Sequence, residues 1–372
     1  MVNFKKSAKV CFVIPEYDPD ISTHFNYLYD FIKVLFSDFD IFLLIEKGAG
    51  MPNFADPNRV YIQKFKFTPL RIIENFLVIF YIRLIGYRDF YIHYSFLSAF
   101  NASLISKFVG GRTFYWNCGL PWLYSRNYFR EKFERAAYRL VTFLVTGTEG
   151  LKNQYAKHYQ LGLSKIKVLP NWINVNQFHK QFEIIQDLKL KLNISPKDKV
   201  ILFVHRLSNR KGAHYLPRII QGLENEKVVL LIVGGGPERE KIELEIRKSR
   251  LEKKVRFLNS IPNKEIQNYF GIADIFIMPS EEEGFPHVLL EAMVVGVPFV
   301  AFDVGGVKEI SPPESLGYIV APYDIKSFSN KIKELLHYNG DRIAKLSEIE
   351  QSWVKQFDLS ITLDKFKDII LK

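Results

Sequence analysis

Cysteine is scarce in this chain, and long uncharged apolar stretches are missing from it. Only two of the 372 residues are cysteines, Cys11 and Cys118, which excludes a disulfide framework and a metal cluster built on cysteine. The apolar runs fall well short of the roughly 18 residues that a membrane-spanning helix needs. The apolar run that follows the first lysines, residues 10–14, is too short for a secretory signal. These absences predict a cytoplasmic protein.

Positive charge is abundant and unevenly distributed. The formal net charge is +11, and residues 1–180 hold 23 Lys and Arg against 13 Asp and Glu. A basic half suits a polyanionic partner, which leaves nucleic acid, anionic lipid and a phosphorylated substrate as candidates. A solvated surface with a positive bias explains the same numbers.

Short β-like runs alternate with helical stretches along the whole chain, and this alternation starts afresh near residue 199. Such a pattern is typical of parallel sheets with crossover helices, so the predicted fold class is α/β. We expect a Rossmann-like domain at residues 1–172 and a second one at residues 173–352. Ligands of such sheets bind at the carboxyl ends of the strands.

The most informative segment runs from Ile277 to Gly306. A buried strand is followed by an acidic turn with Glu283, and then by a helix that contains Glu291. Two carboxylates eight residues apart across a loop and a helix are better placed to hold two portions of one elongated ligand than to flank one bond. Gly284 lets the backbone approach that ligand, and the amides that open the helix face an anion. The alternative is an acidic surface loop with an unrelated helical glutamate.

Two further turns follow strands in the second half. Arg206 and Lys211 lie five residues apart in a polar turn, where a guanidinium and an ammonium can neutralise a diphosphate as negative charge develops on it. Gly235 lies in a run of three glycines that could cradle a phosphate, although a tight structural turn has the same sequence. Asn259 follows the next strand.

The segment with Glu283 and Glu291 resembles the family-4 retaining glycosyltransferases of the GT-B fold, also called glycosyl transferases group 1. The residues that match the pattern of this family are Ser280, Glu283, Gly284, Phe285, Glu291, Ala292, Met293, Gly296, Pro298, Gly305, Gly306 and Glu309. The match is strong over residues 165–325, whereas residues 1–164 match by layout only. The resemblance implies two facing Rossmann-like domains with a cleft between them. It also implies that the last segment, residues 353–372, forms a helix that packs back on the first domain.

The resemblance implies roles for individual residues. Glu283 and the backbone of Gly284, Phe285 and Pro286 would hold the donor sugar, and Glu291 would bind the ribose hydroxyls. Arg206 and Lys211 would act on the diphosphate, with Gly235 and Asn259 on the donor side. The family often has glycine at the position of Asn259, so the identity of the base stays open. Where the family often has His-Asp, this chain has Asn117, which cannot exchange a proton near neutral pH. His93 ends the preceding strand, and both residues are acceptor-side candidates.

The predicted activity is therefore retaining transfer of a sugar from a nucleotide-diphosphate sugar to a hydroxyl acceptor. The expected acceptor is a glycan or a lipid-linked intermediate of cell-envelope polysaccharide synthesis, with no cofactor, no metal and no nucleic-acid partner. One alternative is a GT-B epimerase that acts on the nucleotide sugar alone, and a second is a non-catalytic nucleotide- or glycan-binding relative. A third, a nucleic-acid binder, has only the basic half in its favour.

Two stretches of the first half are candidates for contact with the inner face of a membrane. Pro69–Gly86 is apolar with arginines near its ends, and a helix in the core of the first domain explains it as well. Trp122–Arg139 mixes aromatic and basic residues, as does a helix on an anionic membrane surface, although a solvated charged face is the alternative. The arginines of this second stretch are Arg126, Arg130, Arg135 and Arg139.

Overall fold

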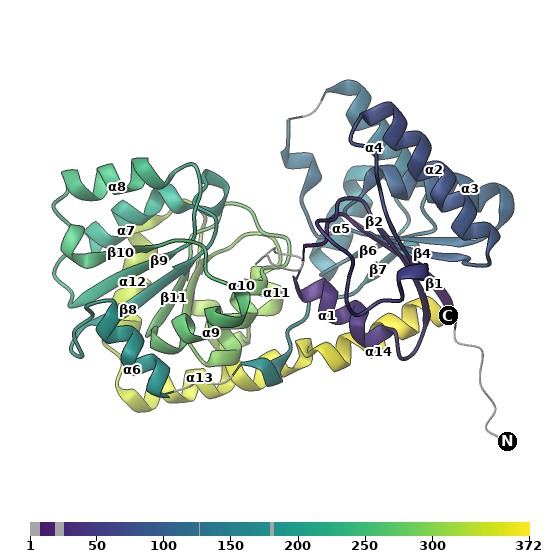
Figure 1. The fold of residues 1–372 in the computed structure, drawn as a ribbon. Coiled ribbons are helices and arrows are strands. Elements are labelled where there is room, and N and C mark those ends of the chain that lie inside the picture. Colours follow the sequence, from purple (N-terminus) through teal and green to yellow (C-terminus); the bar gives the residue numbers. More distant parts are fainter. Residues whose placement is uncertain (1–7, 19–25, 126, 179–181) are drawn as a thin grey trace, which may run out of the picture. The chain divides into compact units, whose positions relative to one another are not determined.

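Both halves of the chain fold around a parallel sheet with helices on its two faces (Figure 1). The computed structural model describes residues 8–18, 26–125, 127–178 and 182–372. Unit 1 extends to Pro170 and includes Ser360–Lys372, and unit 2 is Asn171–Leu359, so the chain passes between the units twice. The predicted α/β class with two Rossmann-like parallel-sheet domains is confirmed. The facing arrangement and the cleft stay predictions.

The sheet of unit 1 has seven strands in the order β3-β2-β1-β4-β5-β6-β7. Its strands read as nearly continuous apolar runs because helices cover both faces of a parallel sheet. They are β1 (Lys9–Ile14), β2 (Asp40–Ile45), β3 (Val60–Ile62), β4 (Asp89–His93), β5 (Arg112–Trp116), β6 (Phe143–Thr146) and β7 (Ile166–Val168).

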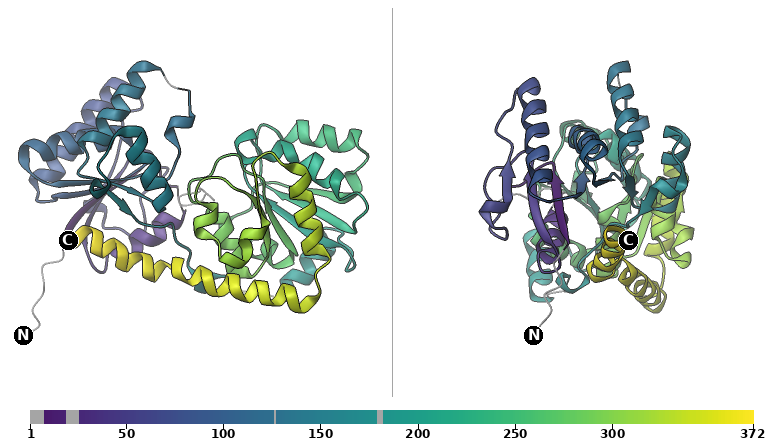
Figure 2. Two further views of the ribbon diagram at one scale, coloured as in Figure 1. Left: turned by 180° about the vertical axis from the view of Figure 1, so that it is seen from behind. Right: turned by 90° about the vertical axis from the view of Figure 1, so that its right-hand side faces the viewer.

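Four helices of unit 1 form a row on one face of this sheet, in the order α2, α3, α4, α5, and the other face carries α1 and α14 (Figure 2). The helices are α1 (Asn26–Leu35), α2 (Thr68–Leu84), α3 (Phe96–Val109), α4 (Tyr128–Leu140), α5 (Glu149–Tyr159) and α14 (Leu359–Leu371). Arg126, which was expected to extend the basic helix, lies outside the described residues. Within α4, Arg135 pairs with Glu131 at 2.8 Å.

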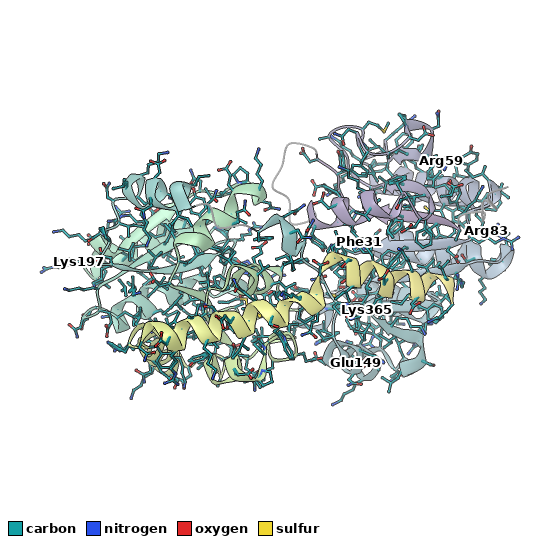
Figure 3. The ribbon with its side chains drawn as sticks, turned by 90° about the horizontal axis from the view of Figure 1, so that it is seen from below. Phe31, Arg59, Arg83, Glu149, Lys197 and Lys365 are labelled. Carbon is teal, nitrogen blue, oxygen red and sulfur yellow. The ribbon has the colours of Figure 1, made fainter. Side chains whose placement is uncertain are left out.

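The last helix supplies a core residue to unit 1. The ring of Phe366 on α14 meets the rings of Phe12, Phe31 and Tyr91 at centroid distances of 4.9–5.6 Å. Figure 3 labels Phe31 beside this helix. The carbonyl of Ile370 accepts a hydrogen bond from Arg112 at 2.6 Å. These contacts assign residues 360–372 to unit 1, whereas residues 353–359 belong to unit 2.

The sheet of unit 2 has six strands in the order β10-β9-β8-β11-β12-β13. The strands are β8 (Lys199–Val204), β9 (Val228–Val233), β10 (Val255–Leu258), β11 (Ile275–Met278), β12 (Phe299–Phe302) and β13 (Ile319–Val320). The helices are α6 (Phe182–Lys191), α7 (Leu216–Gly222), α8 (Arg239–Lys248), α9 (Asn263–Ile272), α10 (His287–Val295), α11 (Val307–Ile310), α12 (Ile325–Leu336) and α13 (Gly340–Val354).

The strand order of unit 2 reverses at its centre. From β8 the chain continues to β9 and β10 on one side, and it then returns to place β11 and β12 on the other side. The connections on the two sides accordingly pack on opposite faces, with α7, α8 and α12 on one and α9 and α10 on the other (Figure 1). The chain therefore leaves β8 and β11 toward opposite faces of the sheet, and such a switch point is where open α/β sheets bind ligands.

Candidate functional site

Two glycines let the loops at the switch point of unit 2 pack backbone against backbone. Gly212 has φ +68°, and a Cβ on it would lie 1.7 Å from the carbonyl oxygen of Pro279. Gly305 has φ +54°, and a Cβ there would lie 1.5 Å from the carbonyl oxygen of Glu283. No residue with a side chain fits either position without displacing the neighbouring loop. The loops after β8, β11 and β12 are thereby held as one assembly.

Within this assembly Lys211 and Glu283, 72 residues apart in sequence, form an ion pair. Lys211 Nζ donates to Glu283 Oε1 at 2.7 Å, and His205 Nε2 lies 3.2 Å from the same oxygen. The side chain of Glu283 is 6% exposed. Burial alone would raise the pKa of this carboxyl, but the Lys211 charge and the adjacent imidazole more than offset burial and hold the pKa well below its usual range.

His205 was not singled out as a binding residue from the sequence. Its side chain follows β8 directly and contacts the buried carboxylate of Glu283. Burial and the Lys211 charge lower the pKa of this imidazole, so His205 is neutral near pH 7. Its position at the end of the strand beside the switch point was the available signal.

Arg206 is an exposed cation of the same loop, as is Arg210. No hydrogen-bond or ion-pair partner for its guanidinium occurs in the part of the chain that the structure describes. Lys211, by contrast, has a side chain that is only 15% exposed. The loop therefore presents Arg206 to solvent and holds Lys211 against a carboxylate.

Glu291 lies in the second turn of α10, which begins at His287 just after the acidic loop. Its carboxyl is partly buried and has no hydrogen-bond partner among the described residues. Burial raises the pKa of Glu291 to about 7. An unpartnered carboxyl in such a place is available to hydroxyl groups of a ligand.

Phe285 and Pro286 connect the acidic loop to α10. The ring of Phe285 is 6% exposed and meets Phe357 edge to face at 5.6 Å, and its carbonyl accepts from Asn171 Nδ2 at 2.9 Å. Pro286 is the residue before the first turn of α10. The carbonyl of Gly284 accepts from the amide of Gly306 at 3.0 Å. These residues fix the loop through their backbone and, for Phe285, through its ring.

The other two donor-side candidates lie on the loops after β9 and β10. The carbonyl of Gly235 accepts from the amide of Leu207 at 2.9 Å, which ties this loop to the one after β8. Asn259 is exposed, and its Oδ1 accepts from Arg239 Nη1 at 2.8 Å. Both are at the carboxyl edge of the sheet, where the topology places ligands.

Both acceptor-side candidates are buried in unit 1. His93 is fully buried and stacks on Trp116 at a centroid distance of 4.6 Å, and burial lowers its pKa to about 3. Neither ring nitrogen of His93 has a hydrogen-bond partner in the described part of the chain. Asn117 Nδ2 donates to the hydroxyl of Tyr138 at 3.0 Å, and its Oδ1 accepts from the amide of Gly119 at 2.8 Å.

A polar cluster that the sequence did not indicate lies at the carboxyl edge of the unit 1 sheet. Glu46, directly after β2, accepts from Arg71 Nη2 at 2.7 Å and from the hydroxyls of Ser95 and Ser98. Ser98 Oγ in turn accepts from Asn75 Nδ2 at 2.8 Å. Over the described residues of both units, no group of three or more His, Cys, Asp and Glu side chains is arranged to hold a metal ion.

Comparison with known proteins gives related sequences and folds. Residues 185–353 match the sequence model of the family described as Glycosyl transferases group 1. An uncharacterised glycosyltransferase of Methanocaldococcus jannaschii is 31% identical over 196 residues, which are 52% of this chain and 50% of that protein. A putative teichuronic acid biosynthesis glycosyltransferase, TuaC of Bacillus subtilis, is 31% identical over 144 residues, 38% of this chain and 34% of that protein. The chain thus aligns with half or less of the length of these two relatives.

A solved structure matches almost the whole chain. Anabaena HepE, in complex with UDP and glucose, superimposes with a TM-score of 0.78 at 18% identity and covers 98% of this chain and 99% of its own. A likeness at this identity concerns the fold, and the fold is that of the two-domain GT-B glycosyltransferases.

Proposed function

We propose that this chain is a retaining glycosyltransferase that uses a nucleotide-diphosphate sugar, since residues 185–353 match the sequence model described as Glycosyl transferases group 1. The observation that carries the proposal is the assembly at the switch point of unit 2, where Lys211 and His205 meet the buried Glu283 beside the exposed Arg206. A buried ion pair contributes little to stability compared with an apolar core of the same volume, so its presence there favours a binding role.

The two cations of this assembly suit the leaving diphosphate. Lys211 has three N–H donors and uses one on Glu283 Oε1, which leaves two for phosphate oxygens. Arg206 can fork onto the same diphosphate from the solvent side. We propose that these side chains supply the positive charge that neutralises the diphosphate as the glycosidic bond breaks, without a bound metal or cofactor.

The two carboxyls suit hydroxyl groups at the two ends of the donor. Lys211 and His205 both contact Oε1 of Glu283, so Oε2 remains for a hydroxyl of the donor sugar. Glu291 would accept hydrogen bonds from the ribose. Gly284, Phe285 and Pro286 position this edge, and Gly235 and Asn259 lie on neighbouring loops that would border the nucleotide.

The reaction breaks the bond between the anomeric carbon and the diphosphate oxygen. The acceptor oxygen forms its bond to that carbon on the same face, and its proton passes to the departing phosphate oxygen. This course keeps the anomeric configuration and requires no protein base. Exclusion of water by the protein would limit hydrolysis of the donor.

For the substrates, the comparisons supply first candidates. UDP is the nucleotide to test first, because Anabaena HepE was solved with UDP and glucose. A glycan or lipid-linked intermediate of cell-envelope polysaccharide synthesis is the proposed acceptor, since TuaC carries the description of a teichuronic acid biosynthesis glycosyltransferase. The proposal places the chain at the inner face of a membrane, where a lipid-linked acceptor would be reached.

The test starts with thermal unfolding of the whole chain in the presence of UDP, GDP, ADP or TDP. One of them should raise the unfolding temperature by mass action, and the corresponding sugar nucleotides are then supplied with an acceptor panel. Formation of a glycoside of unchanged anomeric configuration supports the proposal. A new sugar nucleotide formed from donor alone would identify an epimerase instead. Nucleotide binding without transfer to any acceptor would identify a non-catalytic relative.

A further inference from the structure

We propose that α2 of unit 1 docks in the plane of an anionic lipid surface, with its outer face among the acyl chains and the surrounding cations on the head groups. This inference rests on the proposed function only for the peripheral location, and it names the surface that produces that location. The polarity of the helix, the extent of its apolar surroundings and the charge around them support it.

The outward face of α2 is apolar, unlike that of an ordinary surface helix. Its outward residues follow each other at intervals of three and four, which places them on one stripe, and each side chain is between 36% and 65% exposed. They are Leu70, Ile73, Leu77, Phe80 and Leu84. The inward side combines the buried polar residues Glu74 and Asn75 with the buried Ile79 and Ile82. Helices of globular proteins normally bury the apolar stripe and expose the polar one.

The inward polar residues fix the rotation of α2. Glu74 accepts hydrogen bonds from the hydroxyl of Tyr61 and from the amides of Lys64 and Phe65, at 2.7–3.1 Å. Asn75 donates to Ser98 Oγ at 2.8 Å. Turning the apolar stripe inward would break these buried hydrogen bonds and leave their groups unpaired. The outward stripe is therefore a fixed feature of the fold.

The apolar surface extends beyond the helix itself. Phe65 and Phe67 precede α2, and Phe108 and Val109 end the neighbouring α3; these four side chains are 41–78% exposed. An apolar groove between the two helices is lined by Phe76, Phe80, Leu104, Ile105, Phe108 and Val109. α2 stands at the end of the helix row of unit 1 (Figure 2), so no described helix covers its outer side.

The charge around this surface selects the occupant. Residues 64–110 hold six Lys and Arg against two acidic residues. Glu74 is buried and Asp89 is paired with Arg112 at 2.8 Å, so neither offers free negative charge. Exposed cations border the apolar area, and none has an ion-pair partner in the described part of the chain: Lys64, Lys66, Arg88 and Lys107.

This combination fits a lipid surface better than a second copy of the chain. A helix seam between two copies would be a narrow stripe with flanking charges of both signs, whereas here the apolar area is wide and its border is basic. Aromatic and aliphatic side chains within a cationic border are what an interfacial helix presents to anionic lipid. The described residues contain no helix both long and apolar enough to cross a membrane. A helix of 17 residues, about 25 Å long, can instead lie along the surface.

Flotation with lipid vesicles tests the inference on the full chain, with no nucleotide or sugar present. The vesicles contain equal amounts of phosphatidylglycerol and phosphatidylcholine, or phosphatidylcholine alone. We expect the wild type to float with the anionic vesicles, and Leu77→Asp combined with Leu84→Asp to lower the binding constant by about tenfold or more. The matched control changes two exposed leucines of unit 2, Leu190→Asp and Leu244→Asp, and should bind like the wild type.

A second variant addresses charge and covers the case in which the aspartates impair folding. The combined changes Lys64→Gln, Lys66→Gln and Lys107→Gln should abolish the preference for anionic vesicles and leave the apolar stripe in place. Unchanged flotation of both variants would overturn the inference. So would a wild-type dimer in sedimentation that the aspartate variant converts to a monomer, because the occupant would then be a second copy. Nucleotide binding by these variants should equal that of the wild type. If the chain binds no nucleotide, the proposed donor site is wrong, and the flotation result still tests the docking of α2.

Discussion

At the carboxyl edge of the unit 1 sheet, Glu46 and Asn117 are hydrogen-bonded within the protein, whereas at the same edge of unit 2 several charged side chains are left for a ligand. In unit 1, Glu46 accepts from an arginine and two serines, and Asn117 bonds to a tyrosine and a backbone amide. In unit 2, Arg206 and Glu291 have no partner among the described residues, and Glu283 uses only one oxygen in its ion pair.

The difference separates two uses of buried polarity. A buried polar group costs free energy unless it is hydrogen-bonded, and the buried Glu46 and Asn117 of unit 1 have their partners within the protein. Unit 2 keeps groups whose charge is compensated only in part, and such groups concentrate at functional sites. On this basis we expect unit 2 to bind the charge of the donor and the unit 1 cluster to maintain the fold.

Removing the cation of each cluster should give the largest contrast. Lys211→Met leaves Glu283 buried without its ammonium, so we expect a loss of about 3–5 kcal/mol in the free energy of unfolding and a fall of about 10²–10³-fold in kcat for transfer. Arg71→Met removes the cation from Glu46 and should lower stability with little change in kcat. Denaturant unfolding and initial rates on the folded fraction measure the two effects. An equal loss of kcat in both variants would erase the distinction between the two edges.

Arg206→Ala should affect activity alone. Its guanidinium is exposed and without a described partner, so the free energy of unfolding should change by less than about 0.5 kcal/mol. If it stabilises the departing diphosphate, kcat/KM should fall about 10²-fold. Arg218→Ala, another exposed arginine of unit 2, is the control and should retain full activity. Undiminished turnover in Arg206→Ala would refute its assignment to the diphosphate.

Glu291 should make the affinity of unit 2 for nucleotide depend on pH near neutrality. Because burial raises the pKa of Glu291 to about 7, the carboxyl loses its proton between pH 6 and 8 and becomes a better acceptor for ribose hydroxyls. Nucleotide affinity should rise about five- to tenfold over that range, measured by titration calorimetry. Glu291→Gln should show a flat profile, and a wild-type slope that persists in this variant would place the titrating group elsewhere.

The raised pKa of Glu291 also makes the free energy of unfolding depend on pH. The folded state binds the proton of Glu291 more tightly than the unfolded chain does, so its contribution is complete below the ordinary pKa of 4.5 and is lost as pH rises through about 7. Between pH 5 and 8 the free energy of unfolding of the wild type should fall by about 1–2 kcal/mol, and that of Glu291→Gln should not. The expected fall is no larger because the side chain of Glu291 is partly exposed.

The sequence predicted both sheets because strands buried on two faces, such as β8 and β9, leave unbroken apolar runs. Among the elements that it missed are β3, which has three residues, and α5, whose largely polar sequence resembles a loop. The family-like pattern of Glu283 and Glu291 was visible, and the roles of these residues stay predictions. The pairing of Lys211 with Glu283, 72 residues apart, was not visible in the sequence. It depends on loops that pack together at Gly212 and Gly305.

The sequence also could not show which face of α2 is exposed to solvent. The apolar run of α2 is equally compatible with a core helix and with an exposed one. The choice depends on Glu74 and Asn75, whose hydrogen bonds to distant strands and helices turn the polar side inward. Patterns of polarity show which residues share a helix face, whereas the tertiary hydrogen bonds decide which face is covered.

His93→Phe should have the smallest effect, and it tests the comparison from the side of unit 1. The histidine is fully buried, stacks on Trp116 and has no described partner for its ring nitrogens. A phenyl ring keeps the stacking and removes two unpaired polar atoms, so the free energy of unfolding should stay within about 1 kcal/mol of the wild type or rise. The KM for the acceptor and kcat should be unchanged in steady-state assays, with Asn117→Ala as the destabilising counterpart. A large rise in KM for the acceptor in a stably folded His93→Phe protein would mean that the edge of unit 1 also binds substrate, because no loss of packing could then explain the effect.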